Sequence, residues 1–114
     1  MVINKDFSTE TLDGEALEVA NVIMGVMTSN FPDDWELSGG GCKVFYSAEE
    51  WKERGERHGD GSVLVVVYDG GDHAAFFNYD HESGDCIAAM DNALSEAGYM
   101  HEPINHWSTA IYKN

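Results

Sequence analysis

Basic residues are scarce in this chain, whose 114 residues hold only 6 lysine and arginine side chains against 21 aspartates and glutamates. The net charge is −15, and residues 59–112 contain nine acidic residues with no lysine or arginine at all. A surface of this sign repels phosphate backbones and anionic lipid headgroups. The sequence therefore argues against direct binding to nucleic acid or to a membrane surface.

Long apolar runs and cysteines are also scarce. No window of eighteen apolar residues is present, which argues against a membrane-spanning helix. The N-terminal residues MVINKDFSTE lack the basic region, apolar stretch and small-residue cleavage site of a secretory signal, so we expect a cytoplasmic protein. Cys42 and Cys86 are the only cysteines. A bridge between them stays open, but two free thiols in a reducing compartment are favoured.

The apolar content is sufficient for one folded core. Hydrophobic residues make up 43% of the chain, and five phenylalanines, five tyrosines and three tryptophans are among them. At this length a second domain is not expected. We therefore predict a single acidic domain over residues 1–114.

Hydrophobic periodicity and turn residues predict the order α-β-α-β-β-α-β. The expected helices are Gly14–Thr28, Ala48–Arg57 and a segment from Ser83 to Ala97, and the expected strands are Cys42–Tyr46, Ser62–Tyr68, His73–Tyr79 and Trp107–Tyr112. This order indicates an α+β fold, with a three- to four-stranded, mainly antiparallel sheet and about three helices packed on one side.

Local signals fix several boundaries. Asp13 is the expected N-cap of the first helix, and Ser47 with Glu50 has the spacing of a capping box for the second. Acid-before-base spacing at i,i+4 predicts Glu50–Arg54 and Glu53–Arg57 pairs on that helix. The Asp69-Gly-Gly-Asp72 sequence predicts a tight hairpin turn, because glycine accepts positive φ. Gly98 suits the position that follows a helix end.

Part of the chain shows a family resemblance. GGGCKVFYSAEEW, VLVVVYDGG, FFNYD and the final WSTAIY are similar to a family of small uncharacterised proteins of phages and prophages. The resemblance covers Gly39–Asn114. Family members are richer in cysteine just before the last strand, where this chain has residues 104–108 (INHWS). The resemblance brings no activity; it implies only a setting, phage genes acting in the cytoplasm of a host cell.

Sequence motifs for catalysis and metal binding are weak. His101 and His106 are five residues apart with Pro103 between them, whereas a zinc helix requires H-E-x-x-H, so loop histidines without a metal are expected. The aspartates of residues 69–85 lack the calcium-loop pattern and are expected to be solvated turn residues. Gly39–Lys43 lacks the spacing of a phosphate loop. No cofactor or metal site is predicted.

Cys42 is the only candidate nucleophile. An exposed thiol activated by a histidine would make a small enzyme, the alternative function. The sequence places no histidine beside it, and a cysteine facing the core from a strand is the expected structure.

The distribution of charge carries the main functional hypothesis. Four of the six basic residues lie between Lys43 and Arg57, a segment that four acidic residues neutralise. This distribution predicts a protein that binds a basic, nucleic-acid-handling partner as a DNA mimic. The phage setting that the resemblance implies makes it a phage-type inhibitor of a host protein, of anti-CRISPR or anti-restriction type. A generic acidic adaptor is a second alternative. The predicted contact residues are Asp33, Asp34, Glu36, Asp69, Asp72, Asp80, Glu82 and Asp85. Phe77, Tyr79 or Tyr99 would slow dissociation of the complex if they are exposed.

Overall fold

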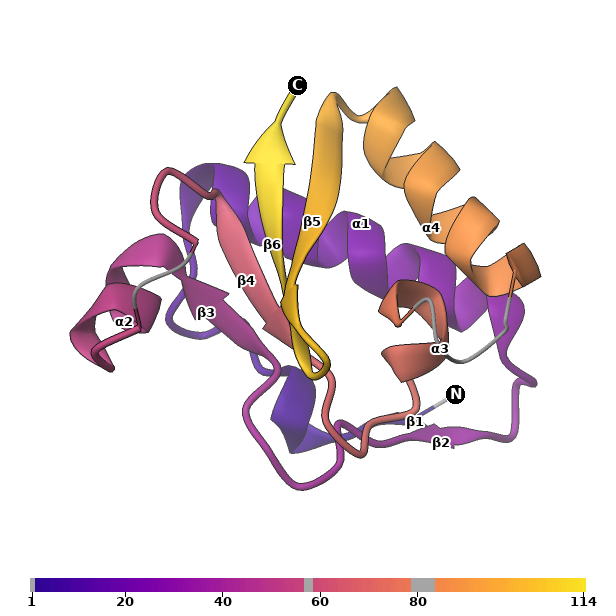
Figure 1. The fold of residues 1–114 in the computed structure, drawn as a ribbon. Helices are drawn as coiled ribbons and strands as arrows, with labels where there is room; N and C mark the ends of the chain where they lie inside the picture. The colour runs from indigo at the N-terminus through magenta and orange to yellow at the C-terminus, as the bar shows by residue number, and fades with distance from the viewer. Residues whose placement is uncertain (1, 57–58, 79–83) are drawn as a thin grey trace.

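A computed structural model describes residues 2–56, 59–78 and 84–114, and it confirms the α+β class. Its centre is a four-stranded sheet in which each neighbouring pair is antiparallel (Figure 1). The strand order across the sheet is β3 (Phe45–Ser47), β4 (Leu64–Val67), β6 (Ser108–Lys113) and β5 (Tyr99–Asn105).

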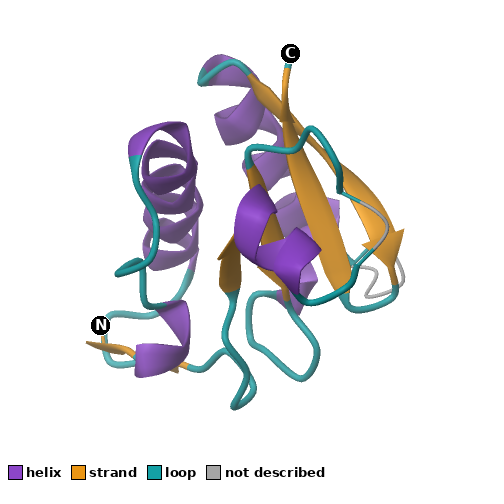
Figure 2. Cartoon of the chain, turned by 90° about the vertical axis from the view of Figure 1, so that its left-hand side faces the viewer, coloured by secondary structure: helices purple, strands orange, loops and turns teal. Residues whose placement is uncertain are grey.

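One face of the sheet packs on helices α1 (Gly14–Asn30), α3 (Ala74–Phe77) and α4 (Gly84–Glu96). Successive side chains of a strand point to opposite faces, so Leu64 and Val66 of β4 enter this side with Ile111 of β6. Figure 2 shows α1 as a separate layer beside the sheet. This face holds the main core.

The opposite face of the sheet packs on α2 (Ala48–Glu53). Val65 and Val67 of β4 form a second small core with Ala110 and with the buried indole of Trp51. The helices are therefore divided, three on the main core and α2 on the other face. Because α2 is short, aromatic residues at its margin stay partly exposed, among them Tyr46 and Trp107.

A second, two-stranded sheet lies below the first in Figure 1, and sequence patterns did not indicate it. Its strands β1 (Val2–Ile3) and β2 (Glu36–Leu37) pair in parallel. The short 3-10 helix η1 (Lys5–Phe7) follows β1. Strands of two residues are too short to give an alternating pattern.

The predicted strand His73–Tyr79 is wrong over its described part, because Ala74–Phe77 form α3. Phe76 and Phe77 are adjacent and both buried, which a strand with one solvated face does not allow. Both edges of β4 are already occupied, by β3 and β6, so no edge is left for a hairpin partner. The Asp69–Asp72 turn therefore leads into a helix.

The predicted loop before the last strand is also wrong, because β5 occupies it. Pro103 lies in β5. Proline has no backbone N–H to donate to a neighbouring strand, and it is tolerated here because β5 lies at the edge of the sheet. The register of β5 against β6 shifts between Pro103 and Asn105. His101, expected in a loop, is a buried residue of this strand.

The remaining helix predictions are close. The capping box is confirmed by reciprocal 3.1 Å hydrogen bonds between Ser47 and Glu50, but α2 ends before Gly55, which takes a φ of 88°. Asp13 lies at the N-cap of α1 without a side-chain capping bond. Gly98, with a φ of 92°, follows α4 as expected, whereas Ser83 and Arg57 lie outside the described residues. None of the described helices has the length and apolarity needed to cross a membrane.

Candidate functional site: the acidic segment around Trp35

The segment of residues 33–36 combines acidic side chains with an exposed tryptophan. Asp33, Asp34 and Glu36 are exposed, and Trp35 between them exposes 45% of its surface. A turn closed by the Trp35 N–H and the Pro32 carbonyl, 3.0 Å apart, leads into β2. Large aromatic residues at this exposure are energetically costly to leave in water and are enriched at the centres of protein interfaces.

Trp35 is held in position by other aromatic rings. Its ring stacks on Phe31 with centroids 6.2 Å apart and planes 13° from parallel, and Phe31 in turn lies 5.7 Å from the buried Phe76. The indole is thus supported from the core. Such support lowers the conformational entropy that a contact side chain loses on binding.

Asp72 has a structural role that the sequence did not reveal. Its carboxylate accepts a 2.8 Å hydrogen bond from the Ser38 N–H, and its own N–H donates to the Ser38 carbonyl at 2.9 Å. These bonds bring the Asp69–Asp72 turn beside the residues that follow β2. Two of the predicted acidic segments are therefore neighbours in space, but Asp72 is half-buried and already bonded.

Two glycine-rich loops pack against each other at this junction. The backbone of Gly40 lies so close to Asp69 and Gly70 that a Cβ atom on Gly40 would meet the Asp69 carbonyl oxygen at 2.5 Å. Gly40 also takes a φ of 83°. The buried carboxylate of Asp6 accepts a 3.0 Å bond from the Gly41 N–H, so η1 supports the same junction.

His73 lies fully buried beneath these loops. Its Nε2 is 2.7 Å from the Val67 carbonyl oxygen, which can only accept, so Nε2 carries the proton. Burial lowers the pKa of His73 to about 4, although the Val67 bond and the charges of Asp72 and Asp6 oppose this shift. The imidazole is therefore neutral near pH 7, and its buried Nδ1 has no hydrogen-bond partner among the described residues.

Asp69 and Cys42 lie elsewhere, at a cavity of about 420 Å³ on the α2 face of the sheet. Lys43, Tyr46, Arg54, Val67 and Trp107 complete its described lining. Cys42 is exposed, so the expectation of a core-facing cysteine is wrong. It is exposed because β3 begins only at Phe45, which leaves residue 42 in the loop. No histidine occurs in the described part of the lining, and both cysteines are free thiols.

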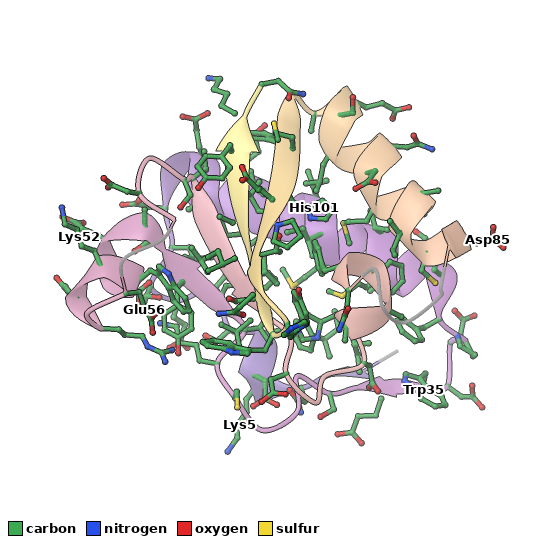
Figure 3. All side chains as sticks on the ribbon, in the orientation of Figure 1. Lys5, Trp35, Lys52, Glu56, Asp85 and His101 are labelled. Atoms are coloured by element: carbon green, nitrogen blue, oxygen red, sulfur yellow. The ribbon has the colours of Figure 1, made fainter. Side chains whose placement is uncertain are left out.

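The remaining predicted contact residue that the structure describes is Asp85, which is exposed at the start of α4. Figure 3 shows Asp85 and Trp35 on the side of the molecule opposite to Lys52 and Glu56. We call the first the acidic side, defined by residues 33–36 and Asp85. The α2 side is defined by residues 43–56. Asp80 and Glu82 lie outside the described residues.

Most described basic residues of the α2 side have acidic or aromatic partners. Lys43 forms an ion pair with Glu50, and Arg54 lies 3.8 Å from Glu56. Burial raises the pKa of Glu50, but hydrogen bonds from Lys43, the Ser47 N–H and Thr11 outweigh it and lower this pKa below its usual value. Glu50 thus bonds Lys43 rather than the predicted partner Arg54.

The C-terminal lysine is paired as well. Lys113 lies 3.1 Å from Glu15, which also accepts a 3.1 Å bond from the Tyr99 hydroxyl. The bonds from Lys113 and Tyr99 lower the pKa of Glu15. Burial is the largest cause that raises the pKa of the Tyr99 hydroxyl, and its hydrogen bond to Glu15 raises this pKa further.

The aromatic residues that would act only if exposed do not meet this condition where the structure describes them. Phe77 and Tyr99 are buried in the main core, and Tyr79 lies outside the described residues. Trp35 was the signal that sequence reasoning missed. Trp35 directly follows Pro-Asp-Asp and precedes Glu36, so it lies in a polar turn segment, where an aromatic side chain is a candidate for exposure.

His101, from the weak metal motif, forms internal contacts with two neighbouring side chains. His101 Nε2 lies 2.7 Å from Asp91 Oδ1, and its Nδ1 lies 3.2 Å from Thr109 Oγ1. Within the described ranges, no three histidine, cysteine, aspartate or glutamate residues are grouped as a metal site would require.

Comparisons with known proteins give no relatives on which to base a function: no family model matches the chain, and neither a curated protein nor a solved structure matches it. The chemistry of its own residues is therefore the basis of the proposals below.

Proposed function

We propose that this protein binds a basic, nucleic-acid-binding surface of another protein through its acidic side, with Trp35 as the apolar anchor. The observation that carries the proposal is the exposed indole of Trp35 between the exposed carboxylates of Asp34 and Glu36, supported from the core by Phe31. Acidic residues supply attraction over distance, and a supported aromatic side chain slows dissociation.

The charge density is high enough for such a role. Duplex DNA carries about one charge per 1.7 Å of axis, so a length of 36 Å, the long dimension of this protein, corresponds to about 21 charges. The protein carries −15, and residues 43–58 contribute none of it because their four basic and four acidic residues cancel. The rest of the molecule therefore has about 70% of the linear charge of DNA.

The resemblance to phage-borne proteins suggests a setting. A host defence protein that handles nucleic acid has the basic groove that this surface would occupy. The proposed activity is thus inhibition by DNA mimicry, of anti-CRISPR or anti-restriction type. Catalysis is not part of the proposal.

Capture from a host lysate, with the full chain immobilised, tests the proposal. We expect a basic protein with nucleic-acid-binding activity to be retained at about 50 mM salt and released at about 500 mM, because screening shortens the reach of charge attraction. Duplex DNA should displace it in proportion to concentration. Retention of no such protein, or of one that duplex DNA does not displace, would contradict the proposal.

A further inference from the structure

The cavity on the α2 side brings together basic and aromatic side chains of the described part of the chain. In a chain with only six basic residues, it brings two of them, Lys43 and Arg54, to one cavity of about 420 Å³. This volume is in the range that small-molecule sites occupy, roughly 300–1,000 Å³. Asp69 completes the polar lining, and Tyr46, Val67 and Trp107 supply apolar walls.

Both cations converge on the same tyrosine ring. Lys43 Nζ lies 4.8 Å from the centroid of Tyr46, and the Arg54 guanidinium carbon lies 5.1 Å from it. Arg54 also lies 4.9 Å from the Trp51 ring and donates a 3.0 Å hydrogen bond to the Tyr46 hydroxyl. These contacts place two cations at the cavity. Lys43 is already paired with Glu50, so Arg54 is the cation that a bound anion would contact first, with Lys43 beside it.

Arg54 has donors to spare for such an anion. A guanidinium has about five N–H donors, and the bond to Tyr46 uses one of them. The Glu56 carboxylate lies 3.8 Å away, which is too long for a hydrogen bond. With its side chain 42% exposed, Arg54 can present the remaining donors to a ligand.

The other walls specify the rest of the ligand. Trp107 is partly exposed and lines the cavity, so its indole can contact a planar aromatic group of a ligand. Asp69 is exposed at the cavity and can accept hydrogen bonds from an amino or N–H group. A molecule with an anionic group, a flat ring and an N–H donor matches this lining.

We infer that this cavity binds a small planar aromatic molecule carrying one anionic group, the chemistry of a nucleoside monophosphate. Arg54 would bind the anion with the Lys43–Glu50 pair beside it, Trp107 would contact the ring, and Asp69 would accept a hydrogen bond from its N–H group. The site is independent of the proposed protein interface, since it lies on the α2 side rather than the acidic side.

Cys42 provides a reporter within the cavity. In a Cys86→Ser variant of the full chain, Cys42 is the only thiol, so its rate of labelling by a thiol reagent measures access to the site. We expect AMP or CMP at millimolar concentration to slow this labelling at least 5-fold. Adenosine and inorganic phosphate, which each carry half of the chemistry, should slow it less than 2-fold. Indole-3-acetate carries a carboxylate instead of a phosphate. Protection by indole-3-acetate rather than by AMP or CMP would show that the ligand is an aromatic carboxylate.

A matched pair of variants tests the role of Arg54. Arg54→Gln should weaken protection by the effective ligand at least 10-fold, whereas Lys52→Gln, which removes the same charge from the same helix but does not line the cavity, should change it less than 2-fold. Trp107→Leu should also weaken it, with circular dichroism confirming the fold. Protection by AMP or by indole-3-acetate that depends on Arg54 supports the inference. It is overturned if neither protects, if phosphate protects as well as AMP, or if the two charge variants behave alike.

Discussion

The acidic side and the α2 side differ in how their charges are used. On the acidic side, Asp33, Asp34 and Glu36 are exposed around Trp35, and the segment contains no basic residue. On the α2 side, Lys43 pairs with Glu50, and Arg54 lies over aromatic rings. Unpaired like charges are useful for attracting an oppositely charged surface over a distance, whereas paired charges fix side chains in place. The proposed docking face therefore lies on the side with exposed acidic residues, and the proposed ligand site lies on the side where basic residues are held by neighbours.

The junction between the two sides gives the largest expected effect on stability. Gly40→Ala should lower the free energy of unfolding by about 3 kcal/mol, because the new Cβ would meet the Asp69 carbonyl at 2.5 Å and φ is positive. Gly41 has a similar φ of 84° but open space around it, so Gly41→Ala should cost only about 1 kcal/mol. Urea denaturation of both variants measures the difference. Equal losses would show that the two loops are not packed as described.

His73, under the same junction, should make stability depend on pH. Its pKa is about 4 in the fold against 6.5 as the ordinary value, so the unfolded chain takes up the proton first as pH falls. The free energy of unfolding should therefore fall between pH about 6.5 and pH about 4, by about 3 kcal/mol in total. His73→Gln keeps an N–H donor for the Val67 carbonyl and should lose this slope. A slope that persists in the variant would assign it to carboxylates instead.

Trp35 should dominate the binding energy of the acidic side. Trp35→Ala should weaken binding of the captured partner by roughly 10- to 100-fold, since buried tryptophan anchors contribute about 2 kcal/mol or more. Met100→Ala is the matched control, because Met100 is similarly exposed at 44% but lies in β5. Calorimetric titration compares the two. Similar losses for both variants would remove Trp35 from the interface.

The smallest expected effect concerns the α2 side alone. Ser47→Ala removes the capping bond to the Glu50 N–H and should cost about 1 kcal/mol of stability, measured by thermal unfolding. It should leave binding through the acidic side unchanged. A loss of partner binding in this variant would mean that the two sides are not independent.

The sequence predicts well where the signal is local. The capping box of α2, the strand β4 and the positive φ of Gly98 just after α4 follow from neighbouring residues, and the structure confirms them. Predictions failed where the outcome depends on long-range pairing. The strand expected at residues 73–79 had a plausible turn before it. However, β6, which starts at Ser108, about forty residues after β4 ends, occupies the edge of β4 that this strand needed.

The candidate site shows the same division. The polarity of residues 33, 34 and 36 is enough to predict that they are exposed. Asp72 is equally polar and also lies in a turn, but its carboxylate accepts a hydrogen bond from the Ser38 N–H. Asp69 is three residues before Asp72 but lies at the cavity on the α2 side, because the chain turns between these two aspartates. Which carboxylates share a face is decided by the packing of two loops that are thirty residues apart.

The most direct test of the account compares two charge reversals that alter the net charge equally. Asp33→Lys/Asp34→Lys/Glu36→Lys acts on the acidic side, and Glu49→Lys/Glu53→Lys/Asp60→Lys acts on exposed acids in and just beyond the α2 side. Each reversal adds two charges, so both variants change −15 to about −9. Kd for the captured partner should rise at least 100-fold in the first variant and less than about 5-fold in the second. Equal losses would show that net charge, rather than one face of the molecule, determines binding.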